Sequence, residues 1–64
     1  MCLASVYEGS VESGNLLLTN VQRIVCGDGF VTLVDLFERE QTIPGRLISV
    51  DLVGNTAVVR KESE

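Results

Sequence analysis

Short apolar runs separated by turn residues fill this chain and predict an all-β fold. We expect strands at residues 2–8, 15–19, 21–26, 30–37, 39–43, 46–53 and 56–60. Turn formers lie between several of these runs, as at Gly27-Asp28-Gly29, Pro44-Gly45 and Gly54-Asn55. Ten valines and three isoleucines against two alanines favour pleated strands over helices. About seven short strands predict a small antiparallel barrel, SH3-like or OB-like.

Three of the runs carry more detailed expectations. Residues 30–37 contain few polar side chains, so this segment is the expected central strand. Residues 39–43 alternate between charged and uncharged side chains, which is typical of an edge strand. In residues 46–53 the alternation predicts that Ile48, Val50 and Leu52 face the core. Asn20 is the expected corner between the second and third runs.

The length of 64 residues limits the chain to one domain, which we place at residues 1–60 with a polar tail at 61–64. A core of this size is marginal, and self-association is a common way to bury more surface. The chain has no histidine, which removes the commonest general base and metal ligand, so we do not expect an enzyme. The net charge of −4 opposes nucleic-acid binding.

The N-terminal residues have no basic start followed by a long apolar stretch, and no segment is long enough to span a membrane. We therefore expect a cytoplasmic protein without a membrane partner, whose cysteines are reduced thiols.

Of the two cysteines, Cys2 carries the clearest candidate chemistry. If Met1 is removed, the Cys2 amine and thiolate close a five-membered chelate on one metal ion. Such ligands suit square-planar Ni(II) or Cu(II), and two copies related by a two-fold axis would fill the plane. The competing interpretation is a small apolar residue that opens the first strand.

The remaining candidate groups have simpler interpretations. Cys26 shares the inward register of Ile24 and is expected to be a buried, inert thiol. Asp35 lies within an apolar strand and is expected to hydrogen-bond a neighbouring backbone or side chain. Two further expectations concern groups of residues: Glu38, Glu40 and Asp51 face solvent, and Tyr7, Phe30 and Phe37 are the aromatic residues available for stacking on nucleic-acid bases.

Several segments of the chain resemble the CooT family of small nickel-binding proteins. The similar segments are residues 1–7 (Met-Cys-Leu-Ala-Ser-Val-Tyr), 20–24 (Asn-Val-Gln-Arg-Ile), 35–36 (Asp-Leu) and 45–52 (Gly-Arg-Leu-Ile-Ser-Val-Asp-Leu). The resemblance implies a compact all-β homodimer that binds Ni(II) through Cys2. It also implies an accessory role, as a metallochaperone that handles nickel during maturation of carbon monoxide dehydrogenase, which would be the client enzyme.

Two alternatives to the nickel-binding hypothesis remain open. Relatives in this family have also carried the label of predicted RNA-binding proteins, so a β-barrel that binds RNA is one of them. The other is a protein adaptor that binds a partner along an exposed strand edge, for which residues 39–42 are the candidate.

Overall fold

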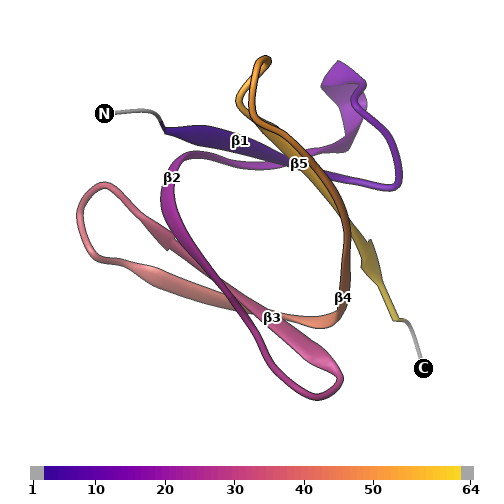
Figure 1. Cartoon of the computed structure of the whole chain (residues 1–64). Coiled ribbons are helices and arrows are strands. Elements are labelled where there is room, and N and C mark those ends of the chain that lie inside the picture. The colour runs from indigo at the N-terminus through magenta and orange to yellow at the C-terminus, as the bar shows by residue number, and fades with distance from the viewer. Residues whose placement is uncertain (1–2, 63–64) are drawn as a thin grey trace.

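The computed structural model describes residues 3–62, which form five strands and one short 3₁₀ helix (Figure 1). The elements are β1 (Ala4–Glu8), η1 (Ser13–Asn15), β2 (Leu16–Cys26), β3 (Phe30–Asp35), β4 (Glu40–Asp51) and β5 (Thr56–Lys61). Strands that follow one another in the chain pair antiparallel, and a parallel pairing of β1 with β5 closes the sheet. The predicted all-β fold is confirmed. None of the described residues belongs to a helix that could cross a membrane.

The prediction of seven strands is wrong, because two pairs of predicted strands are continuous. The runs at 15–19 and 21–26 form one bent strand, β2. Its first half pairs with β1 and its second half pairs with β3. Asn20 adopts a φ of 57° at the bend, which asparagine tolerates better than most residues, so the expected corner turns the strand without ending it.

The runs at 39–43 and 46–53 likewise join into the long strand β4. Pro44 pairs with Phe30 of β3, and the next residue, Gly45, pairs with Lys61 of β5. Gly45 has a φ of 146°, and a Cβ atom at this position would overlap the carbonyl oxygen of Arg60. Glycine is therefore required where β4 bends from one neighbour to the other, and Pro44-Gly45 is not a turn between strands.

The expected edge strand at residues 39–43 falls in the first part of β4. Residues 40–44 pair with β3, and residues 45–51 pair with β5, so each part of β4 has a ladder partner on one side. Within the described residues, β5 does not pair with residues 40–43. The adaptor hypothesis, which uses an exposed edge at residues 39–42, stays a prediction.

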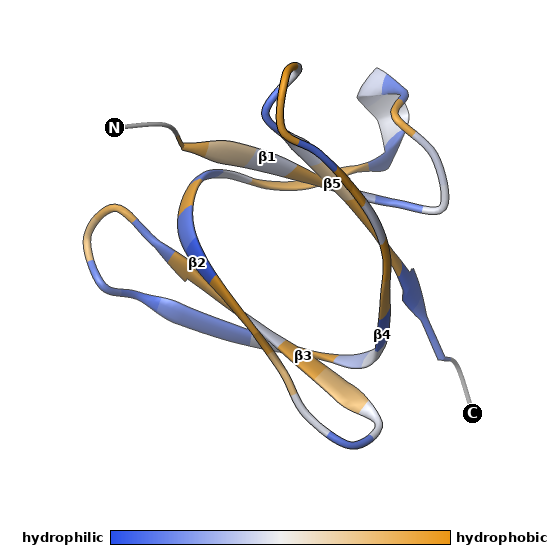
Figure 2. Cartoon of the chain, viewed as in Figure 1, coloured by the Kyte–Doolittle hydropathy of each residue, from blue (hydrophilic) through white to orange (hydrophobic). Residues whose placement is uncertain are grey.

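Nine apolar residues form the buried core of the described part, and most of them are β-branched. They are Val6, Val21, Val31, Leu33, Val34, Ile43, Ala57, Val58 and Val59. Figure 2 shows the corresponding apolar segments along the strands. β-Branched side chains pack well on a pleated surface, so the composition explains why these segments form a sheet.

The expected inward face of residues 46–53 is wrong, because β4 contains a bulge. Leu47 pairs with Val59 and packs on the core, but the register shifts before Ser49, which pairs with Val58. One extra residue at a bulge changes which side chains point inward. Ile48 is 46% exposed and Val50 is 48% exposed, and Leu52 lies beyond the end of the strand.

Candidate metal centre

Cys2, the candidate metal ligand, lies outside the described residues, so the structure begins with the segment that follows it. Leu3 and Ala4 are half-buried, and Ala4 opens β1 by pairing with Val21 of β2. The backbone N–H of Ser5 donates to the carbonyl oxygen of Asn55 at 3.0 Å. The start of β1 is therefore held by hydrogen bonds on both sides, between β2 and the turn that leads into β5.

Cys26 is exposed, which corrects the prediction of a buried thiol. It is the last residue of β2 and pairs with Val31 of β3. Ile24, two residues earlier, is half-buried and packs against the core. The partner of Cys26, Val31, is a buried core residue, so the predicted inward register is right, but the end of β2 is left exposed. Alternation alone does not predict how well the end of a strand is covered.

No cluster of metal-ligating side chains is found within the described residues. Between residues 3 and 62, no group of three or more Cys, Asp or Glu side chains could hold a metal ion, and the whole chain lacks histidine. Soft divalent ions are bound by nitrogen and sulfur ligands in a fixed geometry.

The turn between β3 and β4 is organised by the buried carboxylate of Asp35, which is 3% exposed. Its Oδ1 accepts the backbone N–H groups of Phe37 at 2.9 Å and of Arg39 at 3.0 Å. Its Oδ2 accepts Nε–H of Arg39 at 2.8 Å. The expectation that Asp35 hydrogen-bonds its neighbours is confirmed. Burial alone raises the pKa of Asp35, but the hydrogen bonds from Arg39 and Phe37 outweigh burial and lower it.

Further contacts fix the outer part of the same turn. Glu38 has a φ of 65°, a strained value for this residue, and its carboxylate accepts Nε2–H of Gln22 at 2.6 Å. The guanidinium of Arg39 lies 5.3 Å from the centre of the Phe37 ring. Glu38 belongs to the turn and Glu40 opens β4, so these two carboxylates do not share one strand. Both are exposed, as expected.

The turn between β4 and β5 is built in a related way around Asp51. Its Oδ1 accepts the backbone N–H groups of Val53 and Gly54, each at 3.1 Å. Asn55 has a φ of 56° and completes the turn predicted at Gly54-Asn55. Asp51 is exposed as expected. Its hydrogen bonds to the turn backbone were not predicted from the sequence.

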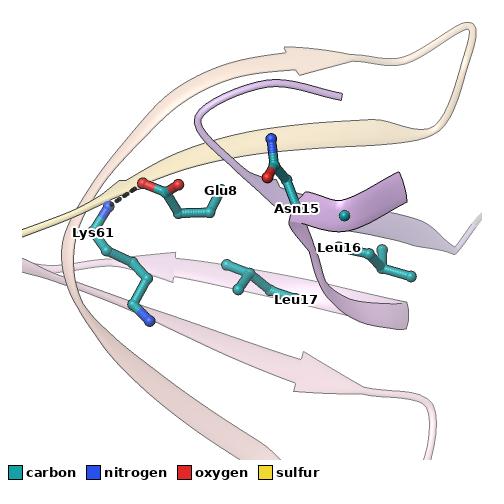
Figure 3. A pocket seen from close by; sticks show the side chains of 6 residues that line it. Glu8, Asn15, Leu16, Leu17 and Lys61 are labelled. Carbon is teal, nitrogen blue, oxygen red and sulfur yellow. Dashed lines mark hydrogen bonds between the residues drawn. The ribbon is translucent and has the colours of Figure 1, made fainter. Parts of the chain in front are cut away.

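An open hollow of about 350 Å³ lies at the other end of β1, away from Ala4 (Figure 3). Its lining includes Glu8, Asn15, Leu16, Leu17 and Lys61. Glu8 accepts the backbone N–H of Lys61 at 3.4 Å. Because a single carboxylate faces this hollow and no cysteine lines it, its side chains do not form a nickel site.

The aromatic residues are not gathered into one stacking platform. Phe30 opens β3, and Phe37 follows the other end of that strand. The six residues of β3 span roughly 17 Å. Tyr7 lies on β1, which does not pair with β3. The structure therefore adds no support to the hypothesis of nucleic-acid binding.

Comparison with known proteins identifies the family. The model of the family described as "CO dehydrogenase accessory protein CooT" matches residues 1–60, which is nearly the whole chain and includes Cys2. No curated protein gives a significant match. The match confirms the resemblance drawn from the sequence. The chain belongs to the CooT family of CO dehydrogenase accessory proteins.

Proposed function

We propose that this protein is a nickel carrier that serves the maturation of CO dehydrogenase. It binds Ni(II) as cargo through the thiolate of Cys2 and the nitrogen of the same residue. The nitrogen is an amine if Met1 is removed and a deprotonated amide if Met1 remains. The observation that carries the proposal is the family match, which runs through Cys2 and names an accessory protein of CO dehydrogenase.

The site is completed by a second copy of the chain. One thiolate and one nitrogen occupy two corners of a square plane, and a two-fold axis supplies the same pair again. The lack of a metal-holding cluster within residues 3–62 supports this arrangement, as does the lack of histidine. The resulting stoichiometry is one nickel ion per two chains.

Loading the site releases protons. Each Cys2 thiol loses its proton to solvent when its sulfur binds the ion, and the nitrogen loses one as well, from the ammonium group if Met1 is removed or from the amide if Met1 remains. Acid therefore competes with nickel for both donors. Two small chains that hold the ion between them can give it up when the client offers a ligand set that binds it more tightly. This lability suits a carrier better than a resident cofactor site.

A nickel titration with two matched variants tests the proposal. Purified protein is stripped with a chelator, reduced, and titrated with NiCl₂ while the thiolate-to-nickel charge-transfer band is followed. Cys2→Ser should abolish the band and the binding. Cys26→Ser is the control, since it removes the exposed thiol at the end of β2 and should leave both unchanged.

The reverse result would overturn the proposal. If Cys2→Ser binds nickel as tightly as the parent and Cys26→Ser loses it, the metal site lies at the other cysteine. Intact mass of the purified protein, measured alongside, establishes whether the nitrogen donor is the Cys2 amine or its amide.

A further inference from the structure

The basic side chains of this acidic protein fall into two groups. Arg23 and Arg39 each form an ion pair with a carboxylate at the turn between β3 and β4. Within residues 3–62, no ion pair involves Arg46, Arg60 or Lys61, although the chain has nine Asp and Glu residues. All three are exposed, on β4 and β5. The positive charge of these two strands is therefore not neutralised by an ion pair within the described part of the chain.

Arg46 and Arg60 lie directly opposite each other. They are register partners in the antiparallel pairing of β4 with β5. Side chains in such a pair share one face of the sheet, with Cβ atoms roughly 5 Å apart, and like charges there destabilise the pairing. The fold gains nothing electrostatically from this arginine pair. A local cost of this kind is typical of residues that serve a function outside the fold.

The arginine pair lies on the outer face of the sheet, far from the start of β1. Leu47 and Val59, the next register partners, pack in the core, so alternation turns Arg46 and Arg60 outward. β1 runs parallel to β5, and its last residue, Glu8, pairs with Val59. Figure 1 shows the start of β1 and the end of β5 on opposite sides of the molecule. A partner bound at the arginine pair would therefore leave the start of β1 uncovered.

Apolar side chains flank the arginine pair. Val58 shares the outer face with Arg60, two residues later on β5, and Tyr7 of β1 is the register partner of Val58. Figure 2 shows hydrophilic colour at the end of β5 and on the part of β4 beside it. We call Tyr7, Arg46, Val58 and Arg60 the arginine face. Tyrosine and arginine are enriched where protein interfaces bind most strongly, so this combination is typical of a protein contact surface.

The charges around the arginine face favour a short acidic segment over a nucleic acid. Glu62 follows Arg60 by two residues on the same side of the chain, and Glu8 lies at the neighbouring end of β1. These carboxylates would repel a long phosphate backbone. Each guanidinium can instead bind one carboxylate with two parallel hydrogen bonds. Alternate residues of an extended chain are roughly 7 Å apart, which matches the spacing of two arginines on neighbouring strands.

We propose that the arginine face docks an acidic segment of the client CO dehydrogenase, with two alternate carboxylates of an extended stretch bound by Arg46 and Arg60. The inference rests on the proposed function for the identity of the client. The docking surface itself uses neither Cys2 nor a bound metal ion. Its occupation is therefore measured on the metal-free protein.

The test is binding to immobilised, nickel-free CO dehydrogenase, followed by biolayer interferometry with chelator and reductant present. The double variant Arg46→Gln/Arg60→Gln should raise the dissociation constant by at least about tenfold, because two charge-assisted contacts are lost. Arg23→Gln is the matched control, since it removes an exposed arginine of β2 and should change the constant by less than about twofold. Binding of the parent should weaken as salt is raised from about 50 mM to about 300 mM.

Urea unfolding separates docking from a structural role of the arginine pair. Because the variant removes a repulsion between like charges, Arg46→Gln/Arg60→Gln should be at least as stable as the parent. A double variant that unfolds at a lower urea concentration than the parent would assign the pair to the fold and overturn the proposal.

A peptide tests the same surface without the client. The probe is acetyl-Thr-Glu-Val-Glu-Thr-amide, and the control replaces both glutamates with glutamine. In NMR spectra of isotope-labelled parent protein, only the glutamate peptide should shift the backbone amide signals of Arg46 and Arg60. Shifts centred on Arg23 or Arg39, or equal shifts with the glutamine peptide, would contradict the assignment.

The remaining outcomes also decide the proposal. A parent that does not bind CO dehydrogenase at low salt, or a double variant that binds like the parent, overturns this inference alone. A parent that retains single-stranded RNA at about 50 mM salt and loses it in the double variant assigns the arginines to phosphate, which also overturns it. Failure of the proposed function is a separate result, nickel binding that survives Cys2→Ser, and it leaves the docking measurement valid.

Discussion

Replacing Gly45 with alanine should destabilise this protein more than any other glycine-to-alanine change in residues 3–62. Gly45 lies at the bend of β4, with a φ of 146°. A Cβ atom there would overlap the carbonyl oxygen of Arg60 and come within 3.0 Å of the Cα atom of Lys61. Both are backbone atoms of a paired strand, so neither can move aside without breaking the pairing of β4 with β5.

The expected magnitude has two parts. Backbone strain at such a φ costs about 1–3 kcal/mol, and overpacking against fixed atoms costs about 1–3 kcal/mol more. Together they amount to about 2–6 kcal/mol, against a total unfolding free energy of about 3–10 kcal/mol for a domain of this length. With a urea m-value of about 1 kcal/mol/M, the midpoint of unfolding should fall by about 2 M or more.

Urea unfolding followed by circular dichroism tests this prediction against two matched variants. Gly14→Ala has open space and an ordinary φ, so its free energy of unfolding should stay within about 0.5 kcal/mol of the parent. Gly29→Ala has open space but a φ of 87°, so it should lose about 1 kcal/mol through strain alone. If Gly45→Ala unfolds at the same urea concentration as Gly14→Ala, β4 does not bend at Gly45 against the backbone of β5.

The remaining predictions concern the two turns and the metal. The pKa of Asp35 lies below its usual value of 3.8, so its ionised form stabilises the fold above that pH, and this contribution is lost as the pH falls through the lowered pKa. Below about pH 4, the free energy of unfolding should therefore fall less steeply with decreasing pH for Asp35→Asn than for the parent. An equal pH dependence in the two proteins would contradict the hydrogen-bonding role of Asp35. Asp51→Ala should lower the free energy of unfolding by about 1 kcal/mol, measured in urea, because two backbone N–H groups lose their acceptor; no loss would contradict the bracing of that turn. Nickel affinity should fall as the pH is lowered, since protons compete for the thiolate; a pH-independent isotherm would argue against thiolate ligation.

Much of the fold could be predicted from local pattern, because valine-rich runs and turn residues are local signals. The turns at Gly27–Gly29 and Gly54-Asn55 are where the sequence placed them. The bends at Asn20 and Gly45 were not predictable in the same way. A residue suited to a positive φ serves equally in a turn between strands and in a bend within one, and the tertiary pairing decides between them.

The outward positions of Ile48 and Cys26 depend on distant parts of the chain. A bulge in β4 shifts the register at Ile48, and the end of β2 that carries Cys26 is left exposed. Neither feature can be recognised from the alternation of apolar and polar residues nearby in the sequence. The two turns that follow Asp35 and Asp51 do have a signal in the sequence, the repeated Val-Asp-Leu at residues 34–36 and 50–52. The assignment of Cys2 as a metal ligand rests on its place in the chain and its chemistry, and it stays a prediction.

Native mass spectrometry of the nickel-loaded protein is the sharpest test of nickel binding between two copies of Cys2, because one spectrum reports chain number, metal content and the presence of Met1. We expect two chains with a single nickel ion for the parent, and only metal-free chains for Cys2→Ser under the same conditions. Nickel retained by a single chain, or retained in full by Cys2→Ser, would contradict it.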